Sequence, residues 1–117
     1  MKRIYHLSSC NTCQRILKQI NPSADVELID IKITNIDSKT LDWIKTKVGS
    51  YEALFSKRAM KYRSMGLDKM TLSEDDYRKY MLEEYTFLKR PFIINGENVF
   101  IGNSQKVVDQ ALESFNS

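Results

Sequence analysis

The feature that most constrains the fold is the order strand, helix, strand at the start of the chain. Residues 2–7 have the pattern of a strand, residues 8–9 form a turn, and a helical pattern begins at Cys10. The helix is expected to end near Pro22, because proline cannot continue a helix, and residues 26–31 then read as a second strand. Such a βαβ unit normally has parallel strands and a right-handed crossover. The sequence therefore predicts an α/β fold whose first strand-to-helix turn is a favoured place for chemistry.

Residues 37–89 are expected to form a helical insertion. They are rich in charged and helix-favouring residues and contain no convincing strand. Ser38 or Thr40 is expected to cap a first helix that ends at Gly49, and a further helix is expected to begin at Ser73. The side chains expected to face inward are Leu41, Ile44 and Val48 on the first helix and Tyr77, Tyr80, Met81 and Tyr85 on the second. Aromatic side chains at this helical spacing indicate packing in a core or an interface.

The last part of the chain returns to strands. Residues 90–94 and 98–101 are apolar runs on either side of Asn95–Gly96, which predicts a hairpin with a type I′ turn and positive φ at both central residues. Ser104 is expected to cap a final helix. The whole order is β-α-β, a helical insertion, then β-β-α. A length of 117 residues suits a single domain over residues 1–117.

Cys10 and Cys13 are the chemically most informative residues. At the start of a helix, unpaired backbone N–H groups and the helix dipole stabilise a thiolate, so the pKa of Cys10 is expected to fall below the usual value of about 8.5. Residues three apart on a helix are about 5–6 Å apart, so Cys13 is within reach for a disulfide and can resolve an adduct on Cys10. We expect Cys10 to be the more exposed nucleophile and Cys13 to lie behind it.

Two other interpretations of the cysteines remain open. They are two small apolar residues of the core, or they bind a metal. Structural zinc needs four ligands, whereas the chain has two cysteines and one histidine, His6, with no partner at metal spacing, so no metal site is expected. His6 is expected to hold the turn, or to lower the pKa of Cys10, or to be an ordinary histidine of a strand.

Charge and hydropathy exclude several classes of protein. A net charge of +3 and a pI near 8.8 fall short of a dedicated nucleic-acid binder, so no direct nucleic-acid binding is expected. No secretory or membrane-spanning segment is present, so we expect a cytoplasmic protein without membrane contact. In a reducing cytosol a lone Cys-x-x-Cys is expected to be catalytic, redox-sensing or metal-binding and not a structural disulfide. The four cations of residues 57–63 either hold an anion or an acidic partner, or form a solvated helical face.

Three segments together carry a resemblance to a known family. They are residues 6–13, which contain the cysteines, residues 53–58, and residues 89–94, which contain Arg90 and Pro91, followed by Gly102 and the final helix. With a Cys-x-x-Cys at the first strand-to-helix turn, this pattern is similar to a thioredoxin-like fold with a mixed four-stranded sheet. The whole chain resembles the arsenate reductase (ArsC) family, which also includes the Spx transcription regulators.

The resemblance implies roles for particular residues. Cys10 resembles the family's nucleophile, with Cys13 as resolving or redox partner; Arg90 resembles the arginine beside the active site, and Pro91 the cis-proline that faces it. Arg58 and Arg90 are the expected anion-binding cations. Asn11 and Thr12, in the first helical turn, are further candidates for binding an anion.

The sequence departs from the family's pattern at two arginine positions. The glutaredoxin-linked reductases gather three arginines around the oxyanion. The third position is Gly102 here, as in the Spx-like members. The first falls on Ser56 in an ungapped match, and Arg58 follows two residues later.

The expected function is therefore a thiol-disulfide oxidoreductase that acts on a small oxyanion or thiol substrate, as a glutathione- or glutaredoxin-linked arsenate reductase does. No bound cofactor is expected, and glutathione, glutaredoxin or thioredoxin would supply electrons. The alternative is an Spx-like redox switch that binds RNA polymerase and uses the cysteine pair as a sensor.

Overall fold

The chain divides into two compact units in the computed structural model, which describes residues 1–117. The first unit consists of residues 1–34 and 90–117, and the second of residues 35–89. The bounds of the second unit lie close to those expected for the helical insertion. That residues 1–117 act as a single domain stays a prediction.

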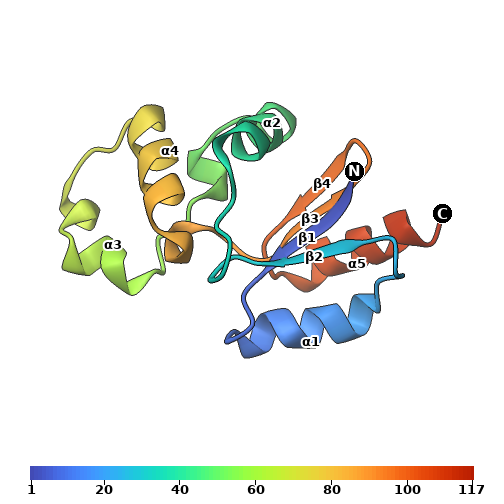
Figure 1. The fold of residues 1–117 in the computed structure, drawn as a ribbon. Helices are drawn as coiled ribbons and strands as arrows, with labels where there is room; N and C mark the ends of the chain where they lie inside the picture. Colours follow the sequence, from blue (N-terminus) through green and yellow to red (C-terminus); the bar gives the residue numbers. More distant parts are fainter. The chain divides into compact units, whose positions relative to one another are not determined.

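A mixed four-stranded sheet forms the centre of the first unit. Its strands are β1 (Lys2–His6), β2 (Glu27–Asp30), β3 (Phe92–Asn95) and β4 (Asn98–Ile101), in the order β2-β1-β3-β4 (Figure 1). β1 pairs with β2 in parallel, while β1 with β3 and β3 with β4 are antiparallel. This topology confirms the predicted βαβ and ββα halves of an α/β fold.

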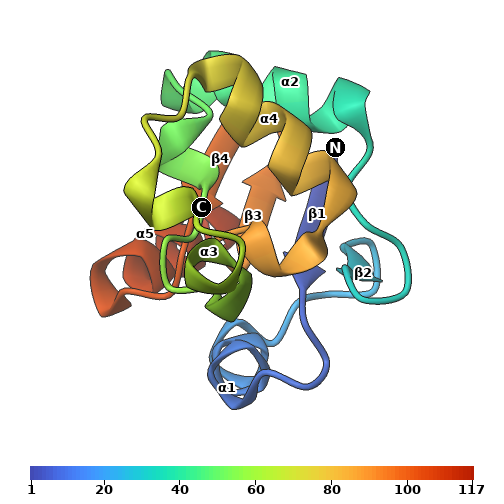
Figure 2. The ribbon, with the colours of Figure 1, turned by 90° about the vertical axis from the view of Figure 1, so that its left-hand side faces the viewer.

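Two helices cover one face of this sheet. α1 (Asn11–Ile20) and α5 (Gln105–Phe115) lie on the same side in both views (Figures 1 and 2). α1 ends where expected, because Asn21 adopts a left-handed conformation with φ 45° directly before Pro22. The core between helices and sheet consists of Ile4, Ile16, Ile20, Val26, Ile93, Val108 and Ala111. The first strand and first helix, which flank Cys10, are thus fixed by apolar packing.

The hairpin forms as predicted, but its turn is not type I′. Asn95 stays in β3 and pairs with Asn98, so Gly96 and Glu97 form the loop. Among these residues only Gly96 has a positive φ, at 64°. The side-chain amide of Asn95 donates to Ser114 Oγ at 2.9 Å and so links this residue to α5. The turn therefore begins at Gly96 and not at Asn95.

The second unit is helical, as expected. Its α-helices are α2 (Ser38–Val48), α3 (Met60–Ser64) and α4 (Glu74–Glu83), and its 3-10 helices are η1 (Glu52–Leu54), η2 (Leu67–Lys69) and η3 (Tyr85–Phe87). Arg78 donates two hydrogen bonds to Asp42, at 2.8 and 3.1 Å, and so links α4 to α2. No helix of the chain is both long enough and apolar enough to span a bilayer.

The helix caps of the second unit are partly as predicted. Ser73 and Asp76 form the capping box of α4. The cap of α2 is Asp37, so the expectation of Ser38 or Thr40 is wrong. The Asp37 carboxylate accepts a hydrogen bond from the Thr40 N–H at 3.1 Å, and the helix therefore begins one residue earlier than a Ser38 cap allows.

Two expected inward-facing positions also differ. Leu41 and Ile44 are fully buried, but Val48 is exposed, because it is the last residue of α2 and the chain leaves the helix at Gly49. Tyr85 is not part of α4, since Glu84 is extended and ends that helix.

An aromatic cluster confirms that Tyr77 and Tyr80 of α4 pack against other side chains. The rings of Phe55 and Phe87 stack with centroids 4.9 Å apart, and Tyr77 contacts Phe55 edge-on at 5.0 Å. Tyr80 contacts Phe87 in the same way at 6.0 Å. These rings and the buried Met81 form an apolar interior for the second unit.

Candidate active site

Cys10 lies at the point where the first strand-to-helix loop enters α1. Its backbone is extended, with φ −94° and ψ 110°, and it occupies the N-cap position. Its N–H donates to the Leu7 carbonyl at 3.0 Å, and its carbonyl accepts from the Gln14 N–H at 3.1 Å. The first turn contains no acidic residue and no side chain caps the helix, so no group of this turn offsets the positive end of the dipole. The predicted position of the thiol at a helix start is confirmed.

The surroundings of Cys10 favour its thiolate. Partial burial opposes ionisation, but the Cys13 backbone N–H, the Cys13 thiol and the Arg90 guanidinium all hydrogen-bond to the Cys10 sulfur, and the net effect lowers the pKa of Cys10. The side chain remains half-buried, so a small reagent can reach it. These are the conditions for a reactive thiol.

Cys13 has the opposite character. Its side chain is fully buried, and this desolvation, together with the charge and hydrogen bond of Cys10, raises the pKa of Cys13 to about 11 against the opposing Leu7 N–H. Both cysteines are free thiols in the structure. The pair thus consists of one accessible thiolate and one protonated thiol behind it.

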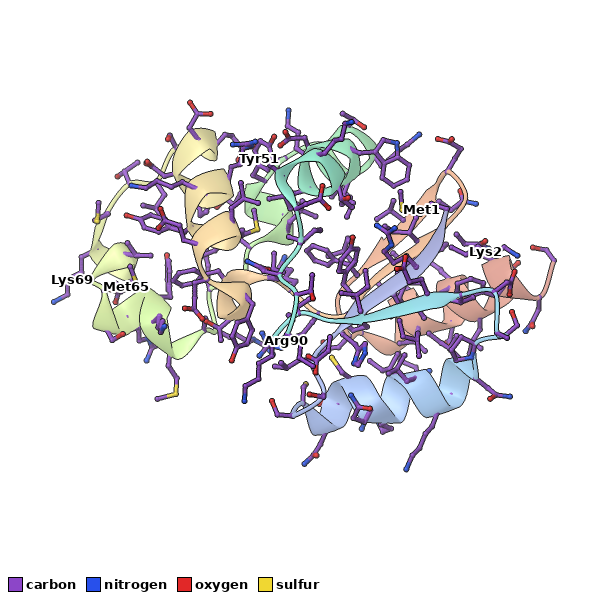
Figure 3. All side chains as sticks on the ribbon, in the orientation of Figure 1. Met1, Lys2, Tyr51, Met65, Lys69 and Arg90 are labelled. Atoms are coloured by element: carbon purple, nitrogen blue, oxygen red, sulfur yellow. The ribbon has the colours of Figure 1, made fainter.

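Arg90 approaches Cys10 from the start of the second half of the sheet. The guanidinium hydrogen-bonds to the Cys10 sulfur, and Figure 3 shows the labelled Arg90 beside the start of α1. The Arg90–Pro91 peptide bond is cis, the isomer that the family resemblance implied. The Pro91 carbonyl accepts a hydrogen bond from the Gly102 N–H at 3.0 Å. The fold therefore brings Cys10, Cys13 and Arg90 together, with Pro91 next to Arg90 in the chain. That these four residues form a catalytic site stays a prediction.

The remaining expected anion-binding residues stay predictions. Asn11 and Thr12 are the first two residues of α1, where backbone N–H groups have no intrahelical acceptor. Arg58 is an exposed residue of the second unit, two positions before α3. No carboxylate forms an ion pair with it.

Sequence reasoning missed two residues that hold the loop before Cys10. The Gln14 side chain donates to the Leu7 carbonyl at 3.1 Å, and the Asp30 carboxylate accepts from the Ser8 N–H at 3.4 Å. Asp30 also accepts from the Lys32 N–H at 3.2 Å. Both had a signal in the sequence: helical side chains lean toward the N-terminus, and the carboxyl ends of parallel strands meet at one edge of a sheet.

His6 lies between these two residues. Its Nδ1 is 3.4 Å from Gln14 Nε2, and it pairs with Asp30 in the register of β1 and β2. The pKa of Asp30 is lowered mainly by a hydrogen bond from the Ser8 side chain. His6 thus belongs to the group that holds the turn. No group of three or more histidine, cysteine, aspartate and glutamate side chains is arranged to hold a metal ion.

Comparison with known proteins gives a consistent result. The sequence model of the ArsC family matches residues 5–111. Comparison with curated proteins gave no match.

Solved structures with the same fold include three from different bacteria. An arsenate reductase from Vibrio cholerae is 20% identical with a TM-score of 0.77, and the match covers 96% of this chain and 95% of that one. An arsenate reductase related protein from Brucella melitensis is 21% identical, with a TM-score of 0.71 and coverage of 93% and 92%. SACOL0876 from Staphylococcus aureus is 24% identical, with a TM-score of 0.73 and coverage of 94% and 97%. Identities this low show the fold, which is the predicted thioredoxin-like fold.

Proposed function

The chain belongs to the ArsC family, which places it among thiol-dependent oxidoreductases, and we propose that it reduces a small tetrahedral oxyanion of the arsenate type with Cys10 as nucleophile. One observation carries this proposal. Cys10 is half-buried at the start of α1, and hydrogen bonds from Cys13 and Arg90 lower its pKa. A nucleophilic thiol beside a guanidinium suits attack on an anion.

Arg90 offsets the repulsion in the first step. A thiolate that attacks an anionic oxyanion brings two negative charges together, and a planar guanidinium can grip two oxygens at once. The N–H groups of Asn11 and Thr12 at the start of α1 add partial positive charge on the same side. We assign these three residues to anion binding, and Arg58 as a further cation.

The reaction balances with two thiols. Cys10 attacks the arsenic, a sulfur–arsenic bond forms, and one oxygen leaves as water. A second thiol then attacks the Cys10 sulfur, the sulfur–arsenic bond breaks, and its electron pair reduces As(V) to As(III). Two thiols are thereby oxidised to one disulfide for each arsenite released.

The second thiol has two candidate sources. Glutathione, from solution or through glutaredoxin or thioredoxin, can attack the half-exposed Cys10 sulfur. Cys13 is buried and can attack only within the chain.

The test is an arsenate reduction assay on the full chain with glutathione, with and without glutaredoxin or thioredoxin. Cys10→Ser is expected to abolish turnover, and Arg90→Gln to lower kcat/KM by roughly tenfold or more, because a charge-assisted contact to the oxyanion is lost. Retained activity in Cys13→Ser would identify a donor from solution, and its loss would identify Cys13 as the resolving thiol. Undiminished turnover by Cys10→Ser contradicts the proposal.

A redox switch is the second candidate. Cys10 and Cys13 are close enough to influence each other's pKa. A peroxide could oxidise the Cys10 thiolate to a sulfenic acid, the peroxide being reduced to water or an alcohol, and attack by Cys13 would then form a disulfide with release of water. The glycine at position 102, shared with Spx-like proteins, also fits this function. The switch is supported if no oxyanion is reduced and purified RNA polymerase binds only the oxidised chain.

A further inference from the structure

Gln14 fastens both ends of the turn that carries Cys10. Its side-chain amide donates to the Leu7 carbonyl at 3.1 Å, and its backbone N–H donates to the Cys10 carbonyl at 3.1 Å. Leu7 and Cys10 are the first and last residues of that turn, joined directly by the Cys10 N–H at 3.0 Å. Gln14 of α1 therefore contacts both the first and the last residue of the turn.

The backbone of Leu7 connects the Gln14 side chain to both cysteines. The Leu7 carbonyl receives two donors, Gln14 Nε2 and the Cys10 N–H. The Leu7 N–H hydrogen-bonds to Cys13. A shift of the Leu7 peptide would move Cys10 away from the Cys13 N–H and from Arg90, which are the groups that stabilise its thiolate.

Other contacts keep the loop folded when Gln14 is changed. Asp30 still holds the Ser8 N–H, and the Ile31 N–H still donates to the His6 carbonyl at 2.8 Å. Gln14 itself is only half-buried. Loss of its amide should therefore alter the position of the turn without unfolding the sheet.

We propose that Gln14 is a positioning residue that holds the Leu7 carbonyl and thereby keeps the Cys10 sulfur in its reactive place. The inference rests on the proposed function in that Cys10 is the nucleophile. Gln14 does not touch the reacting atoms and acts through Leu7.

The experiment compares alkylation of Cys10 by iodoacetamide, from pH 5 to 10, in the wild-type chain, Gln14→Met and Gln19→Met. Methionine keeps the length of the side chain and removes the donor. Gln19 lies on the exposed face of the same helix, where it accepts a hydrogen bond from Gln105 at 3.2 Å, so it is a matched control. Hydrogen exchange of the Cys10 amide and the melting temperature are measured on the same samples.

Gln14→Met is expected to raise the apparent pKa of Cys10, to slow its alkylation at pH 7 by about fivefold, the factor of one neutral hydrogen bond, and to speed exchange of the Cys10 amide. Gln19→Met should match the wild type. If Gln14→Met fails to fold, Gln14→Ala is measured in its place, because alanine has a high helix propensity.

A wild-type pH profile and exchange rate in the Gln14 variant overturn the positioning role and leave the proposed function intact. An ordinary pKa for Cys10 in the wild-type chain instead counts against the proposed function. In that case faster amide exchange in Gln14→Met would still show that Gln14 holds the turn.

Discussion

At the scale of single residues, two cysteines one helical turn apart have opposite environments. Cys10 begins the helix, half-exposed and surrounded by donors, whereas Cys13 points into the core and is fully buried. Burial favours the neutral thiol and hydrogen-bond donors favour the thiolate. The structure therefore assigns nucleophile and partner by solvation as well as by position in the helix.

The raised pKa of Cys13 has a consequence for stability at alkaline pH. Since the unfolded chain loses this proton near pH 8.5 and the folded chain only near pH 11, the neutral thiol favours folding below pH 8.5, and that contribution is lost as pH rises toward 11. The loss should be about 1–2 kcal/mol after allowance for screening. Urea unfolding at pH 7.5 and pH 10.5 measures it, with Cys13→Ala as reference. An equal fall in both chains contradicts the prediction.

At the scale of elements, the site depends on how strands and helices begin and end. Cys10 is the N-cap of α1, and the segment between β4 and α5 contains Gly102, whose N–H bonds the Pro91 carbonyl. Gly102 has φ 95°, while a Cβ added there would meet nothing within 4 Å. Backbone conformation, and not space, therefore favours glycine at position 102.

Gly102→Arg should accordingly destabilise the fold by roughly 1–2 kcal/mol through backbone strain. Gly102→Asn should cost less, because asparagine tolerates positive φ better than other residues. Thermal unfolding of the two variants distinguishes these effects. Equal melting temperatures for Gly102→Arg and the wild type would show that the strain is absent.

At the scale of the whole molecule, the net charge of +3 is small, but its distribution is informative. Among the cations of residues 57–63, Lys57 pairs with Glu52 at 2.7 Å and Lys61 with Glu84 at 2.6 Å. Arg58 and Arg63 have no such carboxylate partner. Half of the cluster is thus neutralised locally, while the guanidinium groups of Arg58 and Arg63 form no ion pair.

We proposed Arg58 as a further cation for anion binding, and on that proposal Arg58→Gln is expected to lower kcat/KM for the oxyanion by roughly tenfold, because one positive charge is lost. The pH profile of Cys10 alkylation should stay unchanged, because Arg58 is not among the groups that stabilise its thiolate. Lys69→Gln, an exposed cation of the same unit, is the control. Unchanged oxyanion kinetics in Arg58→Gln would remove this residue from the proposed anion-binding set.

Local patterns predicted much of the fold and part of the site. The Ser73 and Ser104 caps, the end of α1 before Pro22 and the helical start at Cys10 depend on neighbours in sequence, and all are present. The misassigned α2 cap and hairpin turn depend on longer-range contacts or on a shift of one residue. Asn95, for example, is held in its strand by Ser114 of α5.

The sequence by itself determined the order of elements and the place of a thiol at a helix start, because periodicity, caps and breakers act over a few residues. Only the tertiary structure decided that the Arg90 guanidinium contacts Cys10. Cys10 follows β1 and Arg90 precedes β3, and the antiparallel pairing of these two strands brings the residues to the same edge of the sheet. The register of β1 and β2 puts Asp30 beside His6 at the ends of their strands. Strand pairing is set by burial of the whole sheet face, and that is a property of the packed chain and not of any short segment.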